Sequence, residues 1–223
     1  MRTIQTGSAR PHPKSDPAAI VSLTPAHAAE AARLHILGQP GTFLTALGAG
    51  VLTLIYRTLP ASPVGFGYTA LGVDNQVLGF AAVTTGTGRL FVEMGTRRLG
   101  QLLPLLLARF ARRPSLIPRS VQTVFYPLLV GDGEDGHKPH AELLAIMTEP
   151  AARRRGIGSA LLAAVFADCL RRGLAELTVT VDAANGGARR FYARHGFVFR
   201  REFFLYGRRM TLYARRLSDG MGE

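Results

Sequence analysis

The residues best suited to chemistry lie where an apolar segment gives way to a basic turn that contains two glycines. After the apolar stretch Ala141–Thr148, the chain continues to Arg153, Arg154, Arg155, Gly156, Ile157, Gly158 and Ser159. If a helix begins at this turn, its first backbone N–H groups have no partner inside the helix and can bind an anion. The glycines let that anion approach closely, and the arginines add positive charge. The turn therefore predicts a binding site for a phosphate or pyrophosphate group.

A second pattern further along the chain combines an amide with two aromatic rings. It runs Asn185-x-x-Ala188-x-x-Phe191-Tyr192 and is closed by Gly196-Phe197. Its spacing is helical, and a β-branched strand precedes it. The glycine turn by itself arises easily by chance in a chain this rich in arginine and glycine, so the two patterns in order are more informative than either one.

The elements that must position these residues alternate between strands and helices. Apolar and β-branched runs predict strands at Ile20–Leu23, Phe66–Val73, Val77–Thr85, Ala141–Thr148, Leu177–Asp182, Phe197–Leu205 and Arg209–Leu217. Apolar spacing and capping residues predict helices from Thr24-Pro25 to Leu37 and over Thr42–Leu59, Gly156–Arg172 and Asn185–His195. The turn residues Asp74-Asn75-Gln76 indicate an antiparallel hairpin. The order predicts an α/β or α+β fold built on a sheet.

One block departs from this alternation. Gly88–Val130 is rich in leucine and arginine, has apolar residues at helical spacing, and is interrupted at Pro114 and Pro118. We expect it to be a helical insertion in a single domain over residues 19–217, with a flexible lead-in at 1–18 and a tail at 218–223. The 223 residues are 47% hydrophobic and 19% charged, which excludes a mainly disordered chain.

Composition excludes several other classes. One cysteine, Cys169, cannot support an internal disulfide framework, and no cysteine–histidine cluster indicates a zinc module. The acidic turn at 131–136, flanked by His137 and His140, lacks the ligand pattern of a calcium loop, so no metal is expected there. The most membrane-like stretch, Phe43–Tyr56, is too short to span a bilayer. These features favour a protein of the reducing cytoplasm without a membrane span.

The chain is strongly basic, with 27 lysines and arginines against 15 acidic residues and a formal net charge of +12. Residues 89–119 hold seven arginines against Glu93, and residues 189–216 hold nine against Glu202. A solvated exterior, an anionic acceptor and contact with RNA are all compatible with such surfaces. Aromatic residues are not interleaved with the arginines as in a base-stacking platform, so nucleic acid is not the expected partner.

With the two patterns in this order, the chain resembles the GCN5-related N-acetyltransferase (GNAT) superfamily. The likeness is close over residues 141–199, extends loosely from Ile20 to Leu217, and does not include the block Gly88–Val130. The resemblance implies a mixed, mostly antiparallel central sheet flanked by helices. It also implies acetyl-CoA as the donor cosubstrate and a primary amine of a small molecule or peptide as the acceptor, with direct transfer in a ternary complex.

The resemblance further implies which residues hold the donor. Ile146, Met147 and Thr148 correspond to a bulged strand that offers backbone groups to the pantetheine arm and the acetyl carbonyl. The turn described above corresponds to the pyrophosphate site. Asn185 corresponds to a polar residue on the pantetheine side, and Tyr192 to a tyrosine near the thioester sulfur.

Tyr192 would then be the catalytic acid that protonates the departing thiolate, a transfer that the ordinary phenol pKa of about 10 permits. The alternative is that Tyr192 only packs a helix. For the base, a glutamate often lies in related N-terminal acetyltransferases where Thr180 stands, and threonine cannot act as a base. Glu142 is the expected substitute, because strand alternation would place Glu142, Leu144 and Ile146 on one face. A solvated Glu142, deprotonation through water, and arrival of a neutral amine stay open.

Two alternatives to an enzyme also stay open: a catalytically silent CoA-binding protein of the same fold, and a basic domain that binds RNA or a partner. The leucine-rich insertion and the Phe43–Tyr56 helix could cover the acceptor cleft or form a homodimer face.

Overall fold

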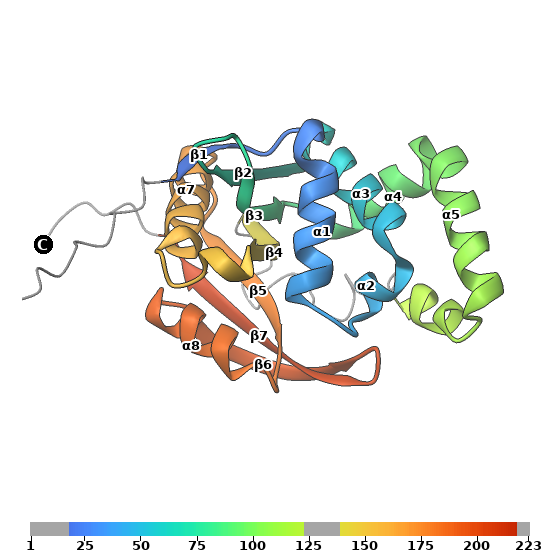
Figure 1. Cartoon of the computed structure of the whole chain (residues 1–223). Coiled ribbons are helices and arrows are strands. Elements are labelled where there is room, and N and C mark those ends of the chain that lie inside the picture. Colours follow the sequence, from blue (N-terminus) through green and yellow to red (C-terminus); the bar gives the residue numbers. More distant parts are fainter. Residues whose placement is uncertain (1–17, 123–138, 218–223) are drawn as a thin grey trace, which may run out of the picture.

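The strands form a single seven-stranded sheet with helices on both faces in the computed structural model, which describes residues 18–122 and 139–217 (Figure 1). The strands are β1 Ala19–Ser22, β2 Gly65–Leu71, β3 Val77–Thr84, β4 His140–Thr148, β5 Glu176–Asp182, β6 Val198–Leu205 and β7 Arg208–Arg216. Their order across the sheet is β1-β2-β3-β4-β5-β7-β6, and of the neighbouring pairs only β4 and β5 are parallel. The mixed, mostly antiparallel sheet is confirmed, as is the hairpin of β2 and β3.

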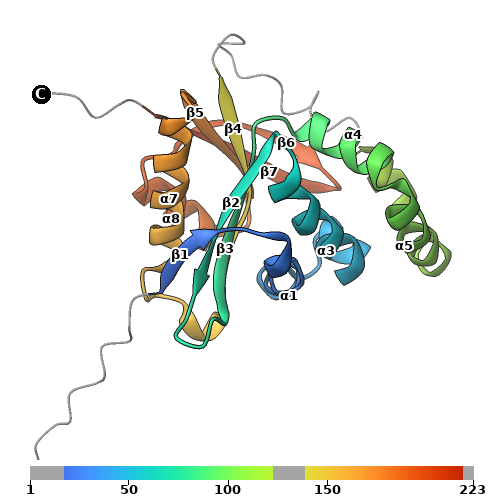
Figure 2. The ribbon, with the colours of Figure 1, turned by 90° about the horizontal axis from the view of Figure 1, so that it is seen from above.

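The helices divide between the two faces of the sheet. They are α1 Ala28–Gly38, α2 Phe43–Leu47, α3 Ala49–Thr58, α4 Thr87–Arg97, α5 Leu99–Arg112, α7 Ile157–Arg171 and α8 Gly186–Arg194. Helices α1 and α3 cover one face, and α7 and α8 cover the other (Figure 2). Most of the expected lead-in, the tail at 218–223, the acidic turn with His137 and the end of the insertion lie outside the described residues. None of the described helices is long and apolar enough to cross a membrane.

The sheet separates two apolar clusters. The cluster on the α1 side includes Leu34, Leu52 and Phe80, all fully buried. The cluster on the α7 side includes Leu161 and Leu177. Burying both faces of the central strands fixes their register, because a slip of one residue would exchange the side chains between the two clusters.

The single helix predicted over Thr42–Leu59 is wrong, because the chain breaks at Gly48 into α2 and α3. Gly48 has a φ of 94°, which leaves the helical region and which glycine adopts without strain. The break leaves the Leu47 carbonyl without its helical partner, and Arg109 of α5 donates its Nε–H to that oxygen at 3.2 Å. Helix α5 therefore satisfies a polar group that the break exposes.

A β-bulge in β4 changes the direction of its side chains. Opposite β3, Ala82 pairs with Ala145 but Val83 pairs with Leu143, so Leu144 is the extra residue. The bulge thus lies at Leu144, ahead of the residues 146–148 where the resemblance had placed it.

The bulge also overturns the expectation that Glu142, Leu144 and Ile146 share one face. Leu144 packs against the cluster on the α1 side, whereas Ile146 packs against the cluster on the α7 side. Strand alternation fails here because one unpaired residue shifts the pleat by one position.

A buried polar pair lies in the α1-side cluster. His35 of α1 is 1% exposed, and its Nδ1 lies 2.5 Å from the hydroxyl oxygen of Tyr56 of α3. The Tyr56 ring packs edge-on against Phe80. Burial lowers the pKa of His35 to about 4, because the imidazolium would lose its solvation there. The imidazole is therefore neutral in the folded protein at neutral pH.

We expect the free energy of unfolding to fall as the pH drops from 7 toward 4. Unfolded His35 titrates near 6.5 and folded His35 near 4, so between these values the unfolded state binds the additional proton. At about 1.4 kcal/mol per pKa unit, the loss at pH 5 is about 2 kcal/mol. Urea unfolding at pH 7 and pH 5 measures this loss of free energy. The variant His35→Gln should show a smaller difference in the free energy of unfolding between the two pH values. His140→Gln, which removes a histidine outside this pair, should not. Equal pH dependence in wild type and His35→Gln would contradict this account.

Candidate functional site

Strands β4 and β5 are paired only at their beginnings and then diverge. The parallel ladder consists of His140 with Glu176, Ala141 with Leu177, and Glu142 with Thr178. Beyond it, β4 continues to Thr148 against β3, and β5 continues to Asp182 against β7. Beyond Glu142 and Thr178, the two strands form no further ladder with each other. The result is a wedge in the sheet, lined by backbone donors and acceptors and open at the ends of both strands.

The basic turn begins α7 near the open end of the wedge. Arg154 and Gly156 have φ values of 62° and 81°, in the left-handed region, whereas Arg153 is extended. Gly156 occupies the N-cap position of α7 and offers no side-chain cap, so the first N–H groups of this 15-residue helix keep no side-chain partner there. Successive N–H groups in such a turn form a concave anion site, and the helix dipole adds to it.

The residues of the turn contribute in different ways. A Cβ at Gly156 would meet no atom within 4 Å, so the space above this glycine is open. A Cβ at Gly158 would lie 3.4 Å from the Phe191 ring, so this glycine mainly allows α8 to pack closely on α7. Ile157 is 6% exposed and belongs to the α7-side cluster, which leaves only its backbone for a ligand.

A pocket of about 560 Å³ opens beside the turn, lined by Arg154, Gly156, Ser159, Arg194 and His195. Ser159 Oγ lies 3.0 Å from His195 Nε2. The pKa of His195 is lowered, first by burial and then by the charges of Arg194 and Arg215, so a neutral imidazole is favoured. A second basic pocket, of about 590 Å³, shares Arg194 and His195 with the first.

Sequence reasoning missed the place of Arg194 and His195 in this pocket. Both lie at the C-terminal end of α8, which is brought to the beginning of α7 by the contact of Phe191 with Gly158. The helical spacing of Phe191 and His195, whose rings lie 4.7 Å apart, was the available signal.

Tyr192 lies in α8 and is 6% exposed. Its ring packs edge-on against Phe191 and Phe197, each with centroids 5.3 Å apart. Burial raises the pKa of the Tyr192 phenol, so the group stays protonated at neutral pH and can donate a proton but not accept one. Asn185 caps α8, because its Oδ1 accepts the Ala188 N–H at 3.0 Å.

Glu142 lies at the closed end of the wedge, opposite Thr178, and is 9% exposed. Its carboxylate accepts a hydrogen bond from Thr87 Oγ1 of α4 at 2.5 Å. Thr180 lies two residues beyond Thr178 on β5, where the strands have already separated. Tyr192 packs in the α7-side cluster, so the acid and base expected from the sequence approach the wedge from different faces.

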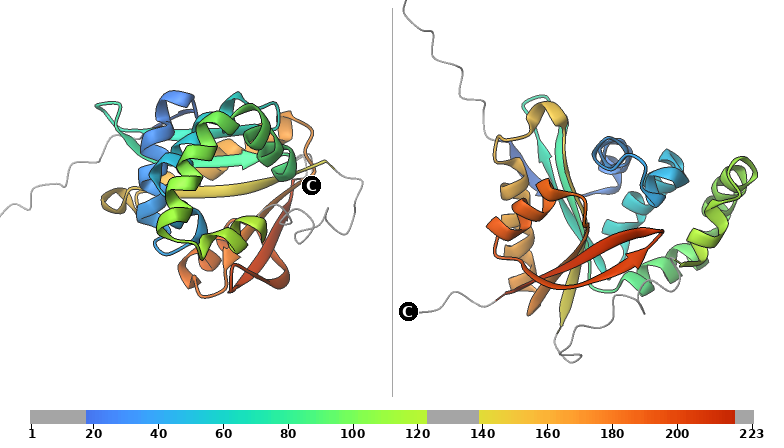
Figure 3. Two further views of the ribbon diagram at one scale, coloured as in Figure 1. Left: turned by 90° about the vertical axis from the view of Figure 1, so that its right-hand side faces the viewer. Right: turned by 90° about the horizontal axis from the view of Figure 1, so that it is seen from below.

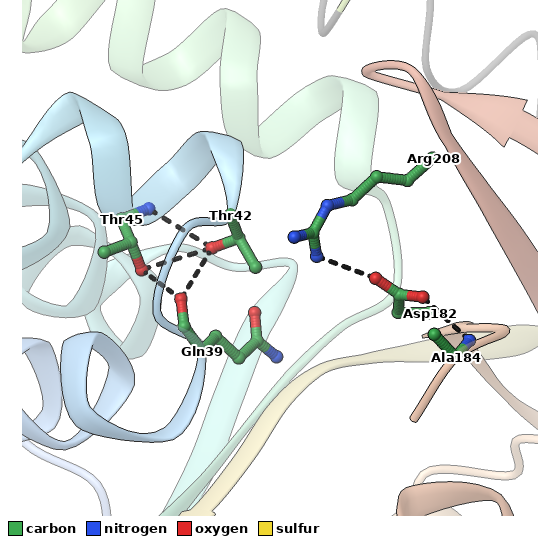
Figure 4. A network of polar contacts seen from close by, with 6 residues as sticks. All are labelled: Gln39, Thr42, Thr45, Asp182, Ala184 and Arg208. Carbon is green, nitrogen blue, oxygen red and sulfur yellow. Dashed lines mark hydrogen bonds and ion pairs between the residues drawn. The ribbon is translucent and has the colours of Figure 1, made fainter. Parts of the chain in front are cut away.

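At the open end of β5, Asp182 binds two partners (Figure 4). One carboxylate oxygen accepts Arg208 of β7 at 2.7 Å, and the other accepts the Ala184 N–H at 2.9 Å. The Arg208 side chain lies toward the loop between α1 and α2, since a Cβ at Gly41 would be 3.9 Å from its guanidinium.

Hydrogen bonds and a ring contact hold the loop between α1 and α2 in place. Thr42 and Thr45 donate their hydroxyls to the Gln39 carbonyl at 3.1 and 2.8 Å (Figure 4). The Phe43 ring stacks on Tyr206, in the turn between β6 and β7, with centroids 4.4 Å apart. These contacts place the two loops side by side on the face of the wedge opposite the α7 turn.

Comparisons with known proteins agree with this geometry. A family model described as "Acetyltransferase (GNAT) family" matches residues 55–197. A mycothiol acetyltransferase from Streptosporangium roseum is 37% identical over 67 residues, which are 30% of this chain. The match spans only 20% of that protein.

Two solved structures share the fold. Ard1 from Thermoplasma volcanium has a TM-score of 0.57 at 16% identity, over 91% of this chain and 99% of that one. NAA60 from Arabidopsis thaliana, in complex with acetyl-CoA, has a TM-score of 0.57 at 13% identity, over 89% of this chain and 98% of that one.

The left-handed backbone at Arg154 makes a prediction about stability. A non-glycine residue in this region carries about 1 kcal/mol of strain that glycine avoids, although glycine costs more entropy on folding. Arg153 has no such strain. In urea titrations, we expect the free energy of unfolding of Arg154→Gly to be about 1 kcal/mol higher than that of Arg153→Gly. A lower value for Arg154→Gly would contradict the strained turn.

Proposed function

The chain belongs to the acetyltransferase (GNAT) family, and from that premise we propose that it transfers the acetyl group of acetyl-CoA to a primary amine. The observation that carries this proposal is the wedge between β4 and β5, which opens beside the turn that begins α7. An extended pantetheine arm would pair with the free strand edges, and the pyrophosphate would bind the N–H groups of the turn.

In this proposal the donor is held by backbone and by charge. Residues 146–148 offer peptide groups along the open part of β4, and Arg153, Arg154 and Arg155 surround the phosphates. Ser159 and His195 line the same pocket. Asn185 keeps its capping bond through Oδ1, and its amide NH₂ is the group that would donate to the pantetheine side. No metal is needed for this chemistry.

Transfer proceeds by direct attack. The amine nitrogen bonds to the thioester carbonyl carbon, the carbonyl electrons move to oxygen, and the tetrahedral intermediate collapses as the carbon–sulfur bond breaks. Unpaired β4 amides polarise the carbonyl. Tyr192 gives its proton to the sulfur as the carbon–sulfur bond breaks; burial raises its pKa, which keeps the phenol protonated at neutral pH and also makes it a weaker acid.

Direct transfer is supported by the cysteine that the chain does contain. Cys169 is fully buried in α7, and burial raises the pKa of its thiol to about 12. A thiol so buried and so weakly ionised is not available to carry the acetyl group as a covalent intermediate. Donor and acceptor would therefore bind together, which gains rate from proximity.

We assign the base to Glu142, whose carboxylate Thr87 orients at the closed end of the wedge. The acceptor, a small molecule or a peptide, would enter between the α1–α2 loop and the turn near Tyr206. We place the reaction in the cytoplasm. Because Thr180 replaces the glutamate often found in relatives, a silent CoA-binding protein is the second candidate, and the assays below separate the two.

Binding of the donor tests the site. We expect calorimetry to give saturable acetyl-CoA binding that Gly156→Glu weakens at least about tenfold, because the new carboxylate would repel the phosphates. Gly173→Glu is the matched control: Gly173 lies just after the other end of α7, with φ of 68° and no atom within 4 Å of a Cβ. Equal losses in both variants, or salt-sensitive RNA binding without donor binding, would refute the proposed site.

Turnover tests the chemistry. With an amine from a panel that supports release of coenzyme A, Tyr192→Phe should lower kcat about 100-fold and leave donor affinity unchanged, since only the proton to the leaving thiolate is lost. Tyr213→Phe, which removes another hydroxyl from the same cluster, is the control.

In the same assay, Glu142→Gln should remove the rise of kcat/KM with pH that a carboxylate base produces. Donor binding with no turnover on any amine would favour the silent CoA-binding protein. Unchanged kcat in Tyr192→Phe would remove Tyr192 from the mechanism.

A further inference from the structure

Helix α5 carries seven large apolar side chains, yet none of its residues is buried. Six of them form two stripes, and the seventh, Leu105, lies against Gly50 of α3. Leu102, Leu106 and Phe110 form an inner stripe that packs against the α1-side cluster. Leu99, Leu103 and Leu107 recur at every fourth residue and form an outer stripe, and these three side chains are 48%, 45% and 57% exposed. The two stripes are neighbouring rows, about 100° apart around the helix, and an exposed apolar row next to a packed one marks a surface that a partner covers.

Helix α5 lies at the end of the molecule farthest from α7 and α8 (Figures 1 and 3). Between Arg98 and Arg109 the helix has one polar side chain, Gln101; the other residues off the two stripes are small or apolar. Arginines lie at both ends, Arg97 and Arg98 before the outer stripe and Arg112 and Arg113 after it. The surface is thus an apolar strip with cations at each end.

We propose that this surface docks on an anionic lipid membrane, with α5 lying in the interface plane. The leucines of the outer stripe would enter the boundary between headgroups and acyl chains, and the terminal arginines would bind lipid phosphates. The charge fits that partner, because residues 89–119 contain seven arginines and one acidic residue, Glu93. Glu93 is already engaged by Ser62 and Arg97.

Other occupants fit these residues less well. A second copy would meet this face through a two-fold interface, which would set the arginine-rich ends against one another. Nucleic acid would match the arginines but would leave the outer leucines in water. A protein partner needs about one hydrogen bond per 100–200 Å², and the strip offers few groups to make them. The proposal does not depend on acetyl transfer.

Co-sedimentation of the full chain with vesicles tests it. We expect binding to vesicles of equal parts phosphatidylglycerol and phosphatidylcholine, and at least about tenfold weaker binding to phosphatidylcholine alone or in high salt. Leu103→Gln combined with Leu107→Gln should reduce binding about tenfold, as should Arg112→Gln combined with Arg113→Gln. Ala108→Gln, on the same helix but off the stripe, should have little effect. Circular dichroism melts establish that each variant folds.

The outcomes are separable. Loss of binding in the leucine and arginine variants, but not in Ala108→Gln, supports the proposal. Binding that depends on the arginines and not on the leucines would mean adsorption by charge alone and would overturn it. A dimer in size-exclusion chromatography that Leu103→Gln with Leu107→Gln dissociates would assign the stripe to a second copy and would also overturn it. If the protein does not co-sediment with anionic vesicles, the proposal is also overturned.

Discussion

The arrangement of the site depends on one constraint: β4 and β5 must separate while each remains hydrogen-bonded to its other neighbour. Strand β4 keeps its ladder with β3 to Thr148, and β5 keeps its ladder with β7 to Asp182. Only three residue pairs join them to each other. A sheet opened in this way leaves backbone groups unpaired at its centre, which costs free energy unless water or a ligand satisfies them. In the proposed function, the extended donor satisfies these groups.

The elements around the wedge follow from this opening. The bulge at Leu144 bends β4 away and re-aims the residues after it. Helix α7 starts beyond the end of β4 and presents free N–H groups, while α8 packs on it through Gly158 and brings Arg194 and His195 to the same pocket. On the other face, the Phe43–Tyr206 stack joins two loops beside the wedge. In the proposed function, donor and acceptor approach from opposite faces and meet between the strands.

The sequence predicted the order of elements and the start of a helix at the glycine–arginine turn, because both depend on local signals: apolar periodicity and turn residues. It could not predict the break at Gly48, since glycine is also found inside helices and the φ of 94° is stabilised by Arg109 from a distant helix. The bulge at Leu144 has no local signal either, because it arises from pairing with β3. For the same reason, the prediction that Ile146 shares a face with Leu144 was wrong. The pocket role of Arg194 and His195 required the packing of two helices, which sequence spacing only suggests.

Hydrogen exchange measured with and without acetyl-CoA tests the central claim most directly, because it reports on the wedge residue by residue. If the donor lies between β4 and β5, amides within residues 143–148 and in the first turn of α7 exchange more slowly when it is bound, and those of the β2–β3 hairpin do not change. Protection confined to the basic pocket beside β6 and β7, with residues 143–148 unaffected, would contradict the account.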